Sequence, residues 1–501
     1  MHQTKAVIDV DLLTFAEQQI TIYGVETNTE RAIPDFYDGM KPVGRRALWA
    51  LSQLPKNQLV KSARIVGDAL GKYHPHGDSS VYGALVTLAT EPTPTVFGEG
   101  NWGTIFDPPA AYRYTNAKLT TYGMSAFHPV YTPVVDYVPS FDRKDKEPLV
   151  LAMLLPQLLF NGASGIGVGM RTSIPSFTPA SVLQVMVSIL EGEQLTAEDY
   201  ASRLRFYSEY GGTPVKSKEN FARAVAFFDS TKGSIEWQSK IETDEVKKTV
   251  RIVGYAPSLK MLPSDSAKTE QKERRDVVSM LRMLDSVANV SQVDGVSYCV
   301  QARRDLNVNE FRRLADKVRQ MTTTRVSYEV YVTERKPVGD GKYEVAFSTL
   351  SIPQLMVKWL KRRVQLEKKS LDWRIAQVET ELHKLNLQLC AADNREIIFQ
   401  VLKSNAPNLE EILAKKLSIS VEDAKYILDL QVRRLSGLSR SDVLEKIKDQ
   451  KAKLNALKAK RKNPVGEVRD FLASAAESFA KYSVFAGTHQ FDFKSVAHTT
   501  L

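Results

Sequence analysis

The order of apolar and polar residues predicts four helices within the first ninety positions. In each, apolar residues recur at three- and four-residue spacing, the pattern of a helix with one buried face. The predicted helices are residues 9–23, 42–54, 63–71 and 78–89. Helix, turn and helix followed by extended segments are typical of a winged-helix DNA-binding domain, with the last helix as its recognition helix. A small helical bundle is the plainer alternative.

The middle of the chain has a mixed pattern. Residues 149–160 form the longest apolar run, but they fall short of the ~18–20 residues that span a bilayer, and Pro156 interrupts them. We therefore expect buried core there. Alternating apolar and polar residues predict strands at 233–242, 247–256 and 325–334. Together these features predict an α/β region of about 200 residues.

From residue 352 onward the spacing becomes that of a coiled coil. One seam follows heptad spacing, and a weaker seam returns after the compact segment 404–438. The seam residues are Leu371, Ile375, Val378, Leu382, Leu385 and Leu389, then Val443, Ile447, Leu454 and Leu457. This pattern predicts an antiparallel stalk with a helical knob suited to dimerisation. A solvated spacer is the alternative, and residues 486–501 resemble a disordered tail.

Composition narrows the class of protein. The 501 residues are 43% hydrophobic, which argues against global disorder, and the net charge of +10 favours a polyanionic partner. Two cysteines are too few for a disulfide framework or a structural zinc site. The N-terminus lacks a signal-peptide pattern. We therefore expect a cytoplasmic protein, associated with the nucleoid, that does not enter a membrane.

Tyr114, in the segment PPAAYRYTN (108–116), is the candidate nucleophile. A free phenol has a pKa of about 10, so a tyrosine that attacks phosphate at neutral pH needs a nearby cation or base. Arg113 is adjacent, but neighbours in an extended chain point to opposite sides. We therefore expect Arg113 to hold the phosphate rather than to contact the phenol of its own chain.

Two polar clusters upstream supply groups that bind phosphate. Arg31, Lys41, Arg45 and Arg46 carry fixed positive charge, and arginine suits bidentate phosphate contacts. In the segment GKYHPHGDSS (71–80), Lys72 adds charge, and the imidazoles of His74 and His76 can hydrogen-bond to phosphate. Structural salt bridges, or a metal site at the two histidines, are the alternatives. Two ligands alone make a weak metal site.

The glycine run NGASGIGVGM (161–170) does not open a predicted helix, so a dinucleotide-binding fold is rejected. Gly165, Gly167 and Gly169 instead suggest close approach of the backbone to another segment. Ile174, if exposed before Pro175, is the candidate wedge between base pairs. No phosphate-binding P-loop or acidic metal cluster is evident. If a divalent metal assists the chemistry, we expect another chain to supply its carboxylates.

These motifs occur in an order that resembles the A-type subunit of type IIA DNA topoisomerases, the subunit shared by gyrase, topoisomerase IV and phage equivalents. The resemblance is specific over about 31–178 and resumes at about 350–480. The motifs are RAIPDFYDGMKPVGRR, IVGDALGKYHPHGDSSVYGAL, GEGNWGT, AAYRYT, LFNGASGIGVGMRTSIP and AKYILDLQVRRLSGL.

The resemblance implies an α+β multidomain fold with a winged-helix domain, an α/β tower domain, and a long antiparallel coiled coil carrying a helical C-gate dimerisation head. The implied order is an N-terminal arm, winged helix, tower, ascending helix, C-gate knob, returning helix and tail. Their ranges are 1–30, 31–160, 161–350, 351–395, 396–440, 441–485 and 486–501.

The resemblance also implies the chemistry. Tyr114 would form a 5′-phosphotyrosyl bond, with Arg113, His76, Arg31, Lys41 and Arg46 in the active site or on phosphates. Ser79 matches the serine of the quinolone-binding helix. Partners would be double-stranded DNA, a second copy of this chain, and a B-type subunit with ATPase and metal-binding (TOPRIM) domains, giving A2B2. That subunit would hold Mg²⁺ and ATP.

Because no glycine-rich wrapping element follows the stalk, relaxation or decatenation is expected rather than negative supercoiling, and a phage-type subunit is suggested. The alternatives from other classes are a non-catalytic architectural protein that bends and bridges DNA, and a metal-dependent nuclease. The missing acidic cluster argues against the nuclease. Only the topoisomerase predicts a covalent adduct that depends on Tyr114.

Overall fold

The computed structural model describes residues 11–55, 58–90, 92–104, 107–259, 276–404, 406–429 and 440–481. It divides into two compact units. The first comprises residues up to Arg363 together with those from Arg469 onward, and the second is Val364–Val468. The predicted tail at 486–501 lies outside the described residues. None of the helices in the described part is long and apolar enough to cross a membrane.

The four helices predicted near the N-terminus are confirmed, but the buried face expected for the first of them is not, because Gly24 is its one buried residue. They are α1 (Leu12–Thr27), α2 (Pro42–Ser52), α3 (Ser62–Lys72) and α4 (Asp78–Leu88). A five-residue π-helix, η1 (Asn28–Ala32), which the sequence did not suggest, follows α1 directly. Gly77 is the N-cap of α4, so Asp78 lies inside the first turn, where its negative charge suits the helix dipole.

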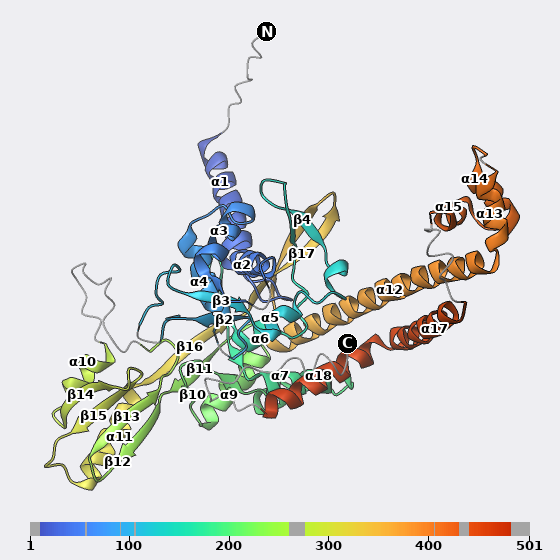
Figure 1. Ribbon diagram of the computed structural model, residues 1–501. Coiled ribbons are helices and arrows are strands. Elements are labelled where there is room, and N and C mark those ends of the chain that lie inside the picture. The colour runs from blue at the N-terminus through green and yellow to red at the C-terminus, as the bar shows by residue number, and fades with distance from the viewer. Residues whose placement is uncertain are drawn as a thin grey trace. The chain divides into compact units, whose positions relative to one another are not determined.

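A small antiparallel sheet accompanies α2–α4 (Figure 1). Its strands are β1 (Val60–Lys61), β2 (Val96–Glu99) and β3 (Asn116–Leu119), in the order β1-β3-β2. The apolar run 149–160 is buried throughout, as predicted, and ends in α6 (Gln157–Asn161). Short elements lie between: α5 (Thr121–Ser125), η2 (Thr132–Val134), β4 (Tyr137–Pro139) and β5 (Lys146–Pro148).

The middle of the chain forms two larger sheets, and each predicted strand segment is confirmed as strand, although 233–242 and 325–334 are each divided between two strands. The five-stranded sheet has the order β10 (Thr213–Pro214), β11 (Lys232–Gln238), β16 (Thr323–Glu329), β7 (Arg171–Ile174), β6 (Ala163–Ile166). The four-stranded sheet has the order β12 (Lys240–Asp244), β13 (Thr249–Gly254), β15 (Ser297–Ala302), β14 (Val287–Val293).

Helices cover these sheets because one face of each sheet is apolar. The face of the four-stranded sheet that carries Val250, Ile252 and Val300 packs on α10 (Val277–Arg282) and α11 (Val308–Met321). The remaining elements of this region are β8 (Ser176–Phe177), α7 (Pro179–Leu190), α8 (Ala197–Arg203), β9 (Phe206–Tyr207), α9 (Lys218–Phe228), and the hairpin β17 (Tyr331–Gly339) and β18 (Lys342–Thr349).

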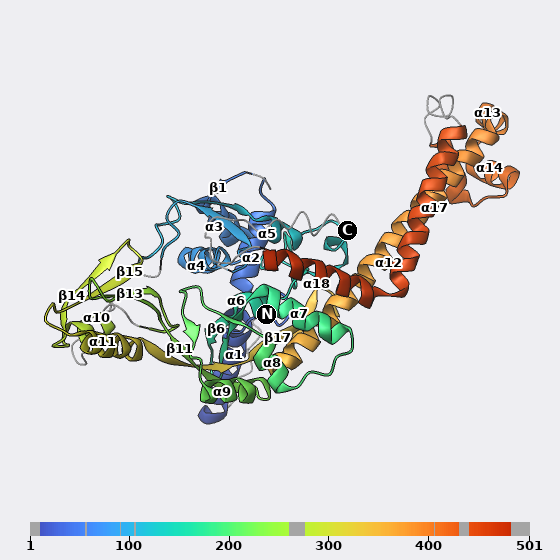
Figure 2. The ribbon, with the colours of Figure 1, turned by 90° about the horizontal axis from the view of Figure 1, so that it is seen from below.

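The long helix α12 (Ile352–Asp393) begins in the first unit and continues into the second. Within the second unit it packs along α17 (Arg440–Lys462) (Figure 2). Every residue of the two predicted seams lies in their shared apolar cluster. A second cluster holds α13 (Arg395–Lys403), α14 (Leu409–Leu417) and α15 (Val421–Leu428) together. The helix α18 (Pro464–Lys481) follows. Part of the predicted knob, 430–439, lies outside the described residues.

Candidate active site

Tyr114 lies on a tight turn just before β3, and its side chain is 63% exposed. The Tyr114 N–H donates to the Ala111 carbonyl at 2.9 Å, which closes the turn. The guanidinium of Arg113 lies over the Tyr114 ring, 4.7 Å from its centroid. The expectation that these side chains point apart is therefore wrong, because it assumed an extended chain where the structure has a turn. A hydrogen bond to Tyr114 raises the pKa of Arg113, so the guanidinium stays charged beside the phenol.

The backbone just after Tyr114 is anchored by a chain of hydroxyl groups. Thr115 is fully buried, and its hydroxyl donates to Ser62 Oγ at 2.8 Å. The Tyr82 hydroxyl lies 3.1 Å from Thr115 Oγ1 and donates to the Ala110 carbonyl at 2.8 Å. Residues on both sides of Tyr114 are thus held by α3 and α4, while the Tyr114 side chain itself remains accessible to a large substrate.

The same turn is tied to the start of α4. The Tyr112 hydroxyl donates to Asp78 Oδ2 at 2.8 Å, and this bond lowers the pKa of the Asp78 carboxyl. Lys72 and Ser79, both predicted DNA contacts, are exposed close to this point in the sequence. The start of α4 and the turn with Tyr114 therefore share one exposed region.

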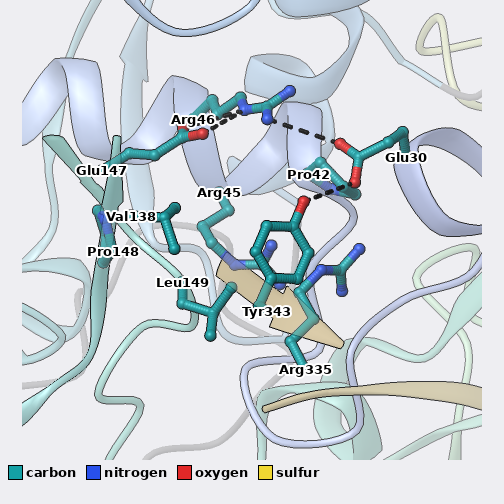
Figure 3. Close-up of a pocket in the computed structure, with 10 residues that line it drawn as sticks. All are labelled: Glu30, Pro42, Arg45, Arg46, Val138, Glu147, Pro148, Leu149, Arg335 and Tyr343. Carbon is teal, nitrogen blue, oxygen red and sulfur yellow. Dashed lines mark hydrogen bonds and ion pairs between the residues drawn. The ribbon is translucent and has the colours of Figure 1, made fainter. Parts of the chain in front are cut away.

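A second group of predicted residues surrounds Arg46. Its Nε donates to both oxygens of Glu147, at 3.0 and 3.1 Å, and its Nη2 lies 3.5 Å from Glu30 (Figure 3). His74 Nδ1 lies 3.3 Å from Arg46 Nη1, and the His74 and His76 rings are 4.6 Å apart. Arg31 is close enough to affect the charge on His74. The structure thus brings Arg31, Arg46, His74 and His76 together.

Within this group only Arg31 and His76 are freely exposed. His74 is buried, which contradicts its assignment as a direct DNA contact. Burial, followed by the charges of Arg46, His76 and Arg31, lowers the pKa of His74 to about 4. His74 is therefore a neutral imidazole at pH 7 and is better suited to orienting Arg46 than to binding phosphate. Arg46 is half-buried and already shared between two carboxylates.

Arg45 is the clearest departure from the prediction. It is 5% exposed and forms a bidentate ion pair with the fully buried Asp38, at 2.6 and 3.0 Å. Asp38 also accepts the Leu151 and Met40 amides. Burial would lower the pKa of Arg45, but the Asp38 carboxylate outweighs it and raises that pKa above its ordinary value. Arg45 holds the core together and is not a phosphate contact, because a buried charge must be paired.

A neighbouring pair completes this buried charge network. Asp35 lies 3.6 Å from Arg335 on β17, and its carboxylate also accepts the Tyr37 amide at 2.9 Å. Burial, and then the Asp38 charge, raise the pKa of Asp35 to about 6. Figure 3 shows Arg335 beside Tyr343, whose hydroxyl donates to Glu30 at 3.2 Å. The segment 35–46 is thus bound to β17 through the buried pair of Asp35 and Arg335.

The glycine-rich segment is a hairpin, β6–β7, and it corrects the wedge assignment. Ile174 is only 4% exposed and pairs with Ala163 at the base, so it is not the exposed wedge. Ile166 stands at the other end of the hairpin and is 85% exposed. Gly165 is needed for close approach, because an added Cβ would lie 2.0 Å from the Ala32 carbonyl oxygen. Lys41 Nζ donates to the Ser164 carbonyl at 2.7 Å, so it supports the hairpin.

Among the described residues, no group of three or more His, Cys, Asp or Glu side chains converges as metal ligands would. The carboxylates around Arg45 and Arg46, namely Asp38, Glu30 and Glu147, are each engaged by these arginines. These residues do not fit a Mg²⁺ site, and we assign no catalytic step to a metal that they hold.

Comparison with known proteins identifies the family. The family model for the A-type subunits of DNA gyrase and topoisomerase IV matches residues 31–473. This chain belongs to that family. The DNA gyrase A subunit of Clostridium acetobutylicum is 30% identical over 93% of the chain, and that of Streptococcus pneumoniae is 28% identical over 89%. The aligned parts cover 55% and 54% of those proteins, so the chain spans about half the length of these relatives.

Two features of this gyrase A-type chain were missed by sequence reasoning. The Asp38–Arg45 pair is separated by seven residues across a turn and the start of α2, and only the Asp-Gly turn signal between them hinted at a bend. Ile166 was passed over, although it is the isoleucine that lies between the two glycines Gly165 and Gly167.

Proposed function

We propose that this chain is the DNA-cleaving and rejoining subunit of a type IIA topoisomerase, with Tyr114 as the nucleophile. The observation that carries the proposal is an exposed phenol on an anchored turn, under the guanidinium of Arg113, in a chain of this family. A nucleophile that is exposed and attached to an anchored backbone can reach a phosphate on a bulky DNA duplex.

The chemistry follows from the groups present. The Tyr114 oxygen attacks the phosphorus and gives its phenolic proton to a base, while the bond from phosphorus to the 3′ oxygen of the strand breaks. The 3′ oxygen takes a proton from water and leaves as a hydroxyl. Arg113 and Arg31 are the cations that offset charge on the phosphate. Rejoining reverses these steps, so the phosphotyrosyl link conserves the energy of the broken bond. Two copies of the chain would cut both strands, and a second duplex would pass through the break.

DNA binding is assigned to the residues that are accessible. His76, Lys72 and Ser79 join Arg31 as backbone contacts, and Ile166 replaces Ile174 as the wedge that unstacks a base step. We assign the winged helix to α2–α4 with β1–β3, the tower to the two larger sheets, and the coiled coil and C-gate to α12–α17.

We further propose that Mg²⁺ and ATP belong to a B-type partner, in a complex with two copies of each subunit. The exposed helix α1 supports a partner there, because seven of its large apolar side chains are half or more exposed. They are Leu12, Leu13, Phe15, Ile20, Ile22, Tyr23 and Val25. An exposed apolar patch on this scale is typical of an interaction site.

The deciding experiment is a denaturant-trapped cleavage assay with supercoiled plasmid, Mg²⁺ and a candidate B-type subunit. We expect protein linked to DNA 5′ ends with the unsubstituted chain and none with Tyr114→Phe. Tyr112→Phe is the matched control, because it removes a phenol two residues away, and its adduct should persist. An adduct that survives in Tyr114→Phe would move the nucleophile elsewhere. DNA bending without any adduct, in an assembled complex, would favour the architectural alternative.

The preference for relaxation or decatenation over negative supercoiling stays a prediction. It is tested by giving the assembled complex relaxed plasmid, supercoiled plasmid and linked circles in the presence of ATP. Conversion of relaxed plasmid to negatively supercoiled plasmid would contradict it.

A further inference from the structure

The hairpin tip that carries Ile166 has little support from its own sheet. β6 is the edge strand of the five-stranded sheet, and β7 joins β16 through a single register pair, Glu329 with Ser173. Gly165 lies in β6, and Gly167 and Gly169 lie in the loop between the two strands, so ordering this tip costs more because glycine loses the most conformational freedom on folding. The tip therefore needs a support from outside the sheet.

Asn28 supplies that support. Its side-chain Nδ2 donates to the Val168 carbonyl at 2.9 Å, and its Oδ1 accepts the Val168 amide at 2.8 Å. One side chain thus makes both hydrogen bonds that a neighbouring strand would make. Asn28 is 4% exposed, so these bonds are shielded from water. A Cβ on Gly167 would lie 1.9 Å from Asn28 Oδ1, so glycine is needed for this approach.

Asn28 is itself held in place. It begins the π-helix η1, whose Thr29 carbonyl accepts from Arg335 at 2.5 Å. Glu30 of the same segment pairs with Arg46 and accepts from Tyr343. π-Helices occur frequently at functional sites. Arg31 also belongs to η1. This five-residue helix therefore contains both the exposed Arg31 and Asn28, the residue that supports the hairpin tip.

We propose that Asn28 is a positioning residue that fixes the Ile166 tip relative to Arg31, so that DNA is bent at a set distance from the phosphate that Arg31 contacts. The inference rests on the proposed function, because it takes Ile166 as the wedge. Asn28 touches no DNA in this proposal and acts through Val168 alone.

The test uses the full chain and a short duplex labelled at both ends for FRET. Asn28→Leu keeps a similar shape and removes both hydrogen bonds. We expect the ratio of bent to straight DNA to fall about tenfold, since two shielded hydrogen bonds hold the tip. DNA affinity should change less than about twofold, because most affinity comes from phosphate contacts. Hydrogen exchange of the Val168 amide should become faster.

Asn220→Leu is the matched control. Asn220 is 3% exposed and bridges Val215 and Glu236 with the same kind of amide-to-backbone bonds, away from the hairpin. It should lower thermal stability without changing the bend. Gly167→Ala tests the contact from the other side, since its methyl group would displace Asn28, and we expect the same loss of bending. Gly167→Ala also tests the inference if Asn28→Leu folds poorly.

A double variant distinguishes positioning from general damage. If Asn28 acts through the tip, adding Asn28→Leu to Ile166→Ala should cost no further bending. The inference would be overturned if both Asn28→Leu and Gly167→Ala bent DNA fully. It would also be overturned if the bending losses of Asn28→Leu and Ile166→Ala multiplied in the double variant. If Ile166→Ala itself bends DNA normally, the wedge in the proposed function fails and the inference fails with it. The Tyr114 adduct tests the cleavage proposal separately.

Discussion

Arg45 and Arg31 lie fourteen residues apart in one basic segment, yet the structure predicts opposite consequences for their loss. Arg45→Ala leaves the fully buried Asp38 without its ion-pair partner, and it removes two side-chain bonds at 2.6 and 3.0 Å. Breaking a buried ion pair by removing one partner costs about 3–5 kcal/mol of unfolding free energy. Arg31→Ala removes an exposed charge and should leave stability nearly unchanged.

DNA binding should respond in the reverse order. Each phosphate contact contributes about 0.9 to the slope of log affinity against log salt concentration. We expect Arg31→Ala to reduce that slope by about one, and Arg45→Ala to leave it unchanged in the fraction that stays folded. The slope is measured by fluorescence anisotropy of labelled duplex at several salt concentrations, and stability by urea unfolding followed by tryptophan fluorescence.

A double-mutant cycle adds the decisive control. Asp38→Ala together with Arg45→Ala removes both charges, so the double variant should be less destabilised than the sum of the single variants. If Arg45→Ala unfolds like the unsubstituted chain and lowers the salt slope, Arg45 binds phosphate and the argument from burial is wrong. Additive losses in the cycle would also refute it.

Three further predictions concern His74, the α12–α17 seam and the face of α1. The pKa of His74 lies near 4 rather than at its ordinary value, so the folded state binds fewer protons than the unfolded state between about pH 4 and 6.5. The free energy of unfolding should therefore rise with pH across that window. His74→Gln should flatten this rise, as measured by urea unfolding at a series of pH values. Leu382→Ala in the α12–α17 seam should lower the free energy of unfolding by about 2–5 kcal/mol. The loss should appear as faster hydrogen exchange within 364–468, and unchanged exchange would argue against the packed seam. Leu13→Glu on α1 should weaken binding of a B-type subunit without lowering the melting temperature, as measured by calorimetry, whereas equal affinity would exclude this face as the interface.

Much of the fold was predictable because its signals are local. Helix periodicity placed α2, α3 and α4 within two residues of their ends, and the heptad residues from Leu371 to Leu389 all lie in the shared cluster. Both signals depend only on which face of a helix is apolar. The sequence also predicted Tyr114 as the nucleophile; the structure shows that its side chain is exposed, and its role stays a prediction.

Apart from the contact between Arg113 and Tyr114, which depends on a local turn, the errors involve segments that are distant in the chain. Nothing near Arg45 in sequence reveals that Asp38 will share its burial with the Leu151 amide. Ile166 and Ile174 both lie on one hairpin, and sequence alone does not tell which end is anchored in the sheet. Asn28 meets Val168 across 140 positions. Such residues acquire their roles from tertiary contacts, which no local pattern encodes.

The hydroxyl chain of Ser62, Thr115 and Tyr82 has a consequence for how this family can diverge. A single change from Ser62 to alanine would remove the acceptor that the buried Thr115 hydroxyl uses at 2.8 Å, and would leave it the more distant Tyr82 oxygen, at 3.1 Å, beside the nucleophile. Apolar replacement of both partners would be tolerated far better than replacement of one. Across related sequences, positions 62 and 115 should therefore exchange together, and a homologue that is apolar at one should be apolar at the other.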